Sequence, residues 1–178
     1  DDLDIKCIDV KWGSTPRNHL NPEVPRHKKL LGTFIDGNNI KEQPIPQGKY
    51  VPALRHADLI YVSGMTPRQN GQLIYSGKIR TKDPIESNKE AVRLAALNAL
   101  TAAQFCLSDG ESISIILQLN VFINAEEDFT DHAKIADYAS ELFIEYLGTN
   151  CIGSRAAIGV ASLPSNARVE ITIIGKVV

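Results

Sequence analysis

Residues 113–123 read ISIILQLNVFI, and every odd-numbered position in this stretch is aliphatic. Alternation with a period of two is typical of a β-strand, because successive side chains point to opposite faces of the sheet. We therefore expect the odd-numbered residues to meet helices. The other face mixes Gln118 and Asn120 with Ile116 and Phe122, so we expect it to meet another subunit or enclosed water.

A helix is expected on each side of this strand. Asp83 suits an N-cap, Pro84 suits the first helical position, and Glu86 completes an arrangement like a capping box. The apolar stripe of this first helix extends to about residue 107. The second helix is expected to start near Thr130 or Asp131 and to end at Gly148, since glycine is the usual C-terminal cap.

Short apolar runs predict the remaining strands. Residues 50–54 and 59–63 are separated by a short polar turn and are typical of a hairpin, and the Asn-Gly pair at 70–71 predicts another turn. Residues 155–160 and 168–174 close the pattern. Two helices and these strands predict an α/β fold, a two-layer sandwich in which a mixed sheet carries both helices on one face.

The face of this sheet opposite the helices is expected to need cover. It combines polar side chains with apolar ones, which is unusual for a face that meets bulk water, so the pattern predicts oligomerisation through the sheet. The residues expected on it are Ile116, Gln118, Asn120, Phe122, Arg155, Glu170, Thr172 and Ile174.

The regular pattern occupies residues 44–178, and residues 1–43 differ from it. This first segment holds three prolines and the basic cluster Arg26-His27-Lys28-Lys29, with little periodicity. We interpret it as an N-terminal extension that lies on the domain surface or on a neighbouring subunit. We interpret the basic cluster as part of a solvated loop in preference to a site that contacts an anion.

The composition excludes several classes of function. A net charge of −2 and a pI of about 6.1 give no general attraction to nucleic acid or to an anionic membrane, and no apolar run is long enough to cross a bilayer. The three cysteines and four histidines show no metal-ligand spacing, and no phosphate-binding loop is present. Free thiols favour a reducing, cytoplasmic location; because the sequence begins with Asp, import into an organelle stays open.

Four landmarks resemble the YjgF/RidA family. The most specific is SRAAIGVASLP at residues 154–164, which is followed by VEI at 169–171. The others are GKYVPA at 48–53, YVSG at 61–64, and Val121-Phe122 followed by Asp128-Phe129. The segment GVASLP at residues 159–164 resembles a less characterised branch of the family more than it resembles the founding deaminases.

The resemblance implies a chorismate-mutase-like fold and a homotrimer, in which three sheets form a central barrel and clefts lie between neighbouring subunits. It also implies hydrolytic deamination of reactive enamine and imine intermediates to 2-keto acids and ammonia. The substrate would be a small carboxylate, and no cofactor and no metal would be needed.

The same resemblance implies that Arg155 and Glu170 are catalytic. A planar guanidinium can bind both oxygens of a substrate carboxylate, and a carboxylate such as Glu170 can position or activate water. Both residues are expected on one face of the sheet. The residues by themselves leave two alternatives open, which are an inter-subunit salt bridge for Arg155 and pairing of Glu170 with Arg155 or Arg168.

Four further residues match positions that line the family's cleft. Tyr50 would close the pocket, Ser63 would bond the ligand, and Gly64 would allow close approach of the backbone. Ala157 would offer its backbone N–H and C=O groups to the substrate.

Two residues depart from the family pattern. Met65 stands where a Gln is usual after Ser-Gly, and Asp137 aligns with an Asn on the second helix that approaches a neighbour's site. We include Asp137 among the substrate-binding positions, where an extra carboxylate would repel a carboxylate substrate.

Two alternative functions remain at this point. The first is a binding module that uses the same cleft for a small carboxylate or another metabolite without turnover. The second is RNA binding or cleavage, which some family members are described to perform; an acidic chain without an aromatic and basic stripe disfavours it.

Overall fold

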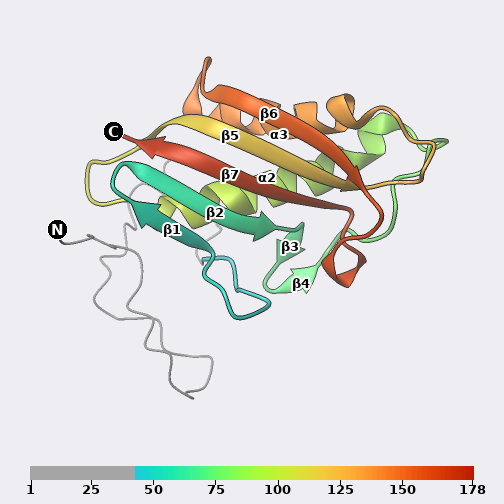
Figure 1. Cartoon of the computed structure of the whole chain (residues 1–178), viewed down its shortest axis with the longest axis horizontal. Coiled ribbons are helices and arrows are strands. Elements are labelled where there is room, and N and C mark those ends of the chain that lie inside the picture. The colour runs from blue at the N-terminus through green and yellow to red at the C-terminus, as the bar shows by residue number, and fades with distance from the viewer. Residues whose placement is uncertain (1–42) are drawn as a thin grey trace.

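Five strands form one mixed sheet in the order β1-β2-β7-β5-β6 (Figure 1). The computed structural model describes residues 43–178, so the predicted extension and its basic cluster lie outside the described residues except for Gln43. β6 runs parallel to β5, and the other neighbours are antiparallel. The strands of this sheet are β1 (Ala53–His56), β2 (Leu59–Met65), β5 (Ile113–Asn124), β6 (Ile152–Val160) and β7 (Val169–Val177).

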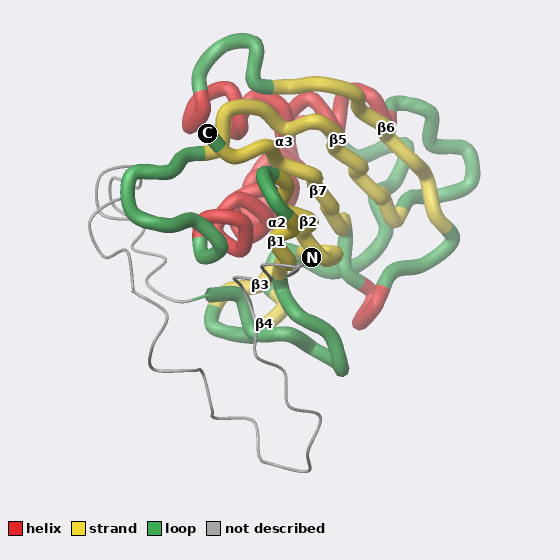
Figure 2. The backbone as a smooth tube through the Cα atoms, turned by 60° about the vertical axis from the view of Figure 1, so that its left-hand side comes forward, coloured by secondary structure: helices red, strands yellow, loops and turns green. Residues whose placement is uncertain are grey.

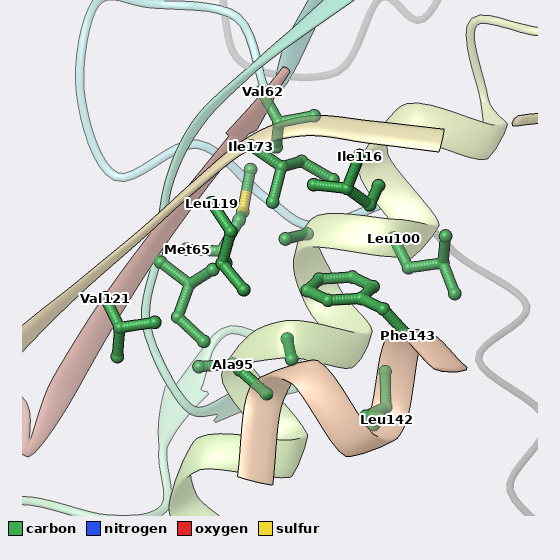
Figure 3. Close-up of a cluster of buried hydrophobic side chains, with 14 of the residues drawn as sticks. Val62, Met65, Ala95, Leu100, Ile116, Leu119, Val121, Leu142, Phe143 and Ile173 are labelled. Carbon is green, nitrogen blue, oxygen red and sulfur yellow. The ribbon is translucent and has the colours of Figure 1, made fainter. Parts of the chain in front are cut away.

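Two helices, α2 (Lys89–Gln104) and α3 (His132–Leu147), cover one face of the sheet (Figure 2), as predicted. α2 packs on β2 and β7, and α3 packs on β5 and β6. The core lies between the layers, where Phe143 of α3 meets side chains of α2 and of the sheet, among them Leu100 and Leu119 (Figure 3). The α/β architecture predicted from the sequence is confirmed.

The turns also follow the sequence. The β1–β2 hairpin forms, although β1 spans Ala53–His56 instead of the expected 50–54 because residues 55 and 56 pair with β2. Asn70 and Gly71 both have positive φ in the turn between β3 (Arg68–Gln69) and β4 (Gln72–Leu73). Gly148 ends α3 with φ 90° and donates its N–H to Ile144 O at 2.9 Å, as expected of a glycine cap.

The start of the first helix was predicted wrongly. Pro84 has ψ 135° and is not yet helical, so a 3-10 turn (Ile85–Asn88) begins after it and α2 follows at Lys89. No side-chain cap is present at this start, and the helix ends at Gln104 rather than near residue 107. The Ser87 hydroxyl instead donates to Pro84 O at 2.6 Å and closes the first turn.

Strand β5 does not keep one face along its length. Its register against β7 shifts between Ile113 and Ile115 and again between Ile116 and Gln118, so the strand bulges twice. As a result Ile116 is fully buried among the helices, whereas Leu117 is 37% exposed. The expectation that Leu117 would face the helices and Ile116 the open face was therefore wrong, although regular alternation holds from Leu119 onward.

A buried ion pair fastens the hairpin to the loop between α2 and β5. Arg55 is 8% exposed and binds both oxygens of Glu111, at 2.5 and 2.8 Å, while Arg55 Nε donates to Ala57 O. The bonds from Arg55 and from the Ser108 N–H lower the pKa of Glu111 to about 2, from an ordinary value of 4.5.

We expect Glu111→Gln to lower the free energy of unfolding at pH 7 by about 2 kcal/mol, because it removes the charge that binds both terminal nitrogens of the Arg55 guanidinium. Since the folded pKa is depressed, the carboxylate contributes this stability above the unfolded pKa, and the contribution fades as the pH falls from about 4.5 towards 2. Urea unfolding of both proteins at pH 7 and pH 3 measures the difference. Glu127→Gln, at an exposed position, is the control, and equal stability of Glu111→Gln and wild type at pH 7 would contradict the expectation.

Candidate functional site

Glu170 lies on the face of the sheet that carries no helix. It pairs across the sheet with Phe122, and its neighbours Val169 and Ile171 are fully buried on the helix side. Gly64 stands directly against it: a methyl group at Gly64 would overlap Glu170 Oε1. A side chain at position 64 would therefore displace the Glu170 carboxyl group, and this close neighbour is a side chain of the same subunit.

Ser63 precedes this glycine, and its hydrogen bonds reach the segment that follows Tyr50. Gly64 lies where the register between β2 and β7 shifts, after Val62, so Ser63 falls within the bulge. The Ser63 hydroxyl donates to Val51 O at 2.6 Å and its N–H donates to Pro52 O at 2.9 Å. These bonds hold the segment that follows Tyr50, whose ring is 45% exposed. Ser63, Gly64 and Glu170 form one group, which we call the Glu170 cluster, whereas the Tyr50 hydroxyl accepts the Gln47 N–H at 3.1 Å.

The chemistry of the Glu170 cluster depends on its carboxyl group. Burial raises the pKa of Glu170 above the ordinary 4.5, because removal from water penalises the charged form. The described residues hold no ion pair to Glu170. Arg168 instead donates to Ser76 O at 3.0 Å and to Asn88 Oδ1 at 3.4 Å. The pairing of Glu170 with Arg155 or Arg168, left open above, is therefore not found within the described part of this chain.

Arg155 lies on the helix side of β6, the edge strand. It pairs in the parallel register with Leu119, which is fully buried, and it reaches helix α3. Its Nη1 donates to Asp137 Oδ1 at 2.7 Å and to Ser140 Oγ at 3.0 Å, and its Nη2 donates to Ala133 O at 3.5 Å. The Arg155 side chain is 24% exposed and that of Asp137 is 56% exposed, so the pair borders on solvent.

Ala157 shares this side of the sheet with Arg155. It pairs with Val121 and packs against the core, which leaves its backbone at the sheet edge. We call Arg155, Ala157, Asp137 and Ser140 the Arg155 cluster. Ser140 was not singled out in the sequence; its position three residues after Asp137 on a helix is the signal that could have found it.

The two predicted catalytic residues do not share a face, and that expectation was wrong. The reason is the pairing of the strands: the parallel register of β6 places Arg155 in the row of Leu119, while β7 places Glu170 in the row of Phe122. Met65 also lies away from both clusters, because its side chain is 6% exposed and packs in the core. Its difference from the family pattern therefore concerns packing rather than the open face.

His132 is a second residue that the sequence did not single out for the site. A methyl group at Gly159 would overlap its Nε2, so the ring of this first α3 residue lies over strand β6. Its ring also meets Phe129 edge to face, with centroids 5.2 Å apart. The imidazole therefore lies on the same side of β6 as Arg155.

The described residues contain neither a cluster of metal ligands nor a membrane-spanning helix. No three His, Cys, Asp or Glu side chains between residues 43 and 178 come together in a way that could hold a metal ion. No helix in that range is long and apolar enough to cross a membrane.

Comparisons with known proteins agree with this fold. The family model described as endoribonuclease L-PSP matches residues 40–177. Protein TCP17 of Trypanosoma cruzi is 30% identical over 128 residues, covering 71% of this chain and 79% of that protein. The 2-iminobutanoate/2-iminopropanoate deaminase of Dermatophagoides farinae is 30% identical over 129 residues, covering 72% and 85%.

A solved structure extends the comparison to three dimensions. The crystal structure of the protein Atu1372 from Agrobacterium tumefaciens is 33% identical and has a TM-score of 0.65, covering 74% of this chain and 83% of that one. The family model spans all of the sheet described above. The chain therefore belongs to the endoribonuclease L-PSP family, which is the YjgF/RidA family.

Proposed function

We propose that this protein hydrolyses reactive enamines and imines of 2-amino acids to 2-keto acids and ammonia, at clefts between the subunits of a homotrimer. The observation that carries the proposal is the half-buried Glu170, which has a raised pKa, no ion pair within the described residues, and Gly64 opposite it. A relative at 30% identity is named as a deaminase of 2-iminobutanoate and 2-iminopropanoate, which supports the substrate class.

The separation of the two clusters supports a site shared between subunits. Hydrolysis needs an anion-binding group and a proton acceptor at one substrate, yet within one chain the Arg155 cluster and the Glu170 cluster lie on opposite faces of the sheet. A second subunit could bring its Arg155 cluster to the Glu170 cluster of the first. The open face also exposes Leu54, Tyr61 and Ile158, at 38%, 42% and 37%, and a neighbouring sheet would bury them.

In this proposal the protein supplies position and proton transfer. Arg155 binds the substrate carboxylate, and water adds to the carbon of the C=N bond while Glu170 accepts a proton from that water. Proton transfer to the nitrogen then allows the C–N bond to break, which releases ammonia and leaves the 2-keto acid. An enamine first becomes the imine by protonation at carbon. No cofactor takes part in these steps.

One observation favours a second candidate function. Arg155 already bonds a carboxylate of its own chain, Asp137 at 2.7 Å, which suits a module that binds a metabolite without turnover. Binding of a 2-keto acid that survives Glu170→Gln, in a protein that never accelerates deamination, would favour this module over the enzyme.

We expect Arg155→Ala to lower kcat/KM for freshly generated 2-aminoacrylate by about 10- to 100-fold, because the substrate carboxylate loses a charged hydrogen-bonding partner. Release of the keto acid above the spontaneous rate is the measurement. Arg93→Ala is a matched control, since Arg93 has the same 24% side-chain exposure and pairs with Glu145 at 2.8 Å, between the two helices. A loss of equal size in both variants would point to general destabilisation.

We expect activity to return when Arg155→Ala and Glu170→Gln proteins are mixed, unfolded together and refolded. A shared cleft can then combine the intact Glu170 cluster of one subunit with the intact Arg155 cluster of another. The keto-acid assay on the mixture, compared with each variant refolded alone, gives the result. No recovery, in mixed particles shown to contain both chains, would mean that one subunit supplies both residues.

We expect the acid limb of the kcat/KM profile to lie above pH 4.5 and to disappear in Glu170→Gln, together with about 100-fold of the rate. A general base works only when it is deprotonated, so the rate should fall as the pH drops below the pKa of Glu170. Burial raises this pKa above its ordinary value of 4.5. The pH dependence of initial rates measures it. An unchanged limb in the variant would assign that titration to another group.

We expect Gly64→Ala to lose activity with little loss of thermal stability. The added methyl group meets the flexible end of the Glu170 side chain, so the carboxyl group moves while the backbone stays. Gly77→Ala gives the opposite control: nothing lies within 4 Å of a methyl group there, but its φ of 86° makes the residue strained, so stability falls and the site keeps its geometry. Full activity of Gly64→Ala would show that the position of Glu170 is not critical.

A further inference from the structure

Asp137 gives the Arg155 cluster a second charge. Arg155 uses Nη1 for Asp137 and Ser140 and reaches Ala133 O with Nη2, and a guanidinium has more N–H donors than these bonds use. Asp137 offers Oδ1 to the arginine, and its side chain is 56% exposed. The nearby Lys134 is paired with Asp131 at 2.9 Å, so it does not compete for Asp137.

The net charge of the Arg155–Asp137 pair determines which ligands can bind beside it. Arg155 and Asp137 together are neutral, so a ligand with a carboxylate alone would add an uncompensated negative charge beside Asp137. A ligand that also carries a cation next to its carboxylate keeps the balance. Its carboxylate can take the remaining donors of Arg155, and its N–H groups can donate to Asp137. In 2-amino and protonated 2-imino acids these two groups stand on neighbouring atoms of the same carbon skeleton.

We propose that Asp137 is a specificity-determining residue, which makes the Arg155 cluster prefer zwitterionic 2-amino and 2-imino acids over simple carboxylates. The inference rests on the proposed function in that Arg155 is taken as the group that binds the substrate carboxylate. Asp137 acts on the ligand directly, through its charge, and needs no step of the hydrolysis itself.

The test compares L-alanine with propanoate, which has the same carbon chain without the ammonium group. Isothermal titration at fixed pH and ionic strength gives both dissociation constants. We expect the wild-type protein to bind L-alanine about two- to fivefold more tightly than propanoate, the range of a partly exposed ion pair. The ratio of interest is the dissociation constant of propanoate divided by that of L-alanine. In Asp137→Asn we expect this ratio to fall to about one, because L-alanine binds more weakly and propanoate binds more tightly.

A matched control separates this pair from the general charge of α3. Glu145 lies on the same helix and pairs with Arg93 at 2.8 Å, and the two side chains have the same exposures as the Arg155–Asp137 pair, 24% and 56%. Glu145→Gln removes the same charge without touching Arg155. We expect it to keep the wild-type preference for L-alanine. In turnover, Asp137→Asn should raise KM for the imino acid with little change in kcat, since binding rather than chemistry is altered.

The possible outcomes distinguish the proposed role of Asp137 from the deaminase proposal. A wild-type ratio of one or below, or an Asp137→Asn protein that keeps the preference, overturns the role of Asp137. A wild-type ratio of one or below needs no variant, so it overturns the role of Asp137 even if Asp137→Asn does not fold. If turnover depends on Arg155 while the ratio is one, the deaminase proposal stands alone. If Arg155→Ala changes neither binding nor turnover, both proposals fail together.

Discussion

The pairing of β6 with β5 determines where each functional side chain lies. The two strands are parallel, and Arg155 pairs with Leu119, whose side chain is buried beneath the helices. On the other side of β5 the antiparallel β7 pairs Glu170 with Phe122. Phe122 points to the face opposite that of Leu119. Because side chains alternate along a strand, a shift of one residue in either register would exchange the faces. The division into two clusters is thus a property of the sheet.

Two glutamates show how surroundings set the behaviour of one side chain. Glu111 receives hydrogen bonds from Arg55 and the Ser108 N–H, which lower its pKa and make it a structural anion. Glu170 has no ion pair within residues 43–178, and burial raises its pKa towards the range where proton transfer is useful. Gly64 leaves room for the carboxyl group in this position, since a methyl group there would overlap Glu170 Oε1.

The same contrast applies to two arginines with equal exposure. Arg93 pairs with Glu145 and links α2 to α3, so its charge serves the contact between the helices. Arg155 pairs with Asp137 at the edge of the sheet, where a second molecule or subunit can reach it. An ion pair at such an edge is a weak link within the chain, and in our proposal it is a neutral receptor for a ligand that carries both charges.

The sequence by itself determined the family, both helices, the strands, the Asn-Gly turn and the glycine cap at Gly148, because each depends on local pattern. It also grouped Arg155 with Ala157 on one side of their strand. Only the tertiary structure decided which side that is, that bulges in β5 bury Ile116, and that Asp137 meets Arg155. Alternation fixes faces within one strand, whereas the relation between strands depends on register, on direction and on bulges, which are set by contacts between residues far apart in the chain.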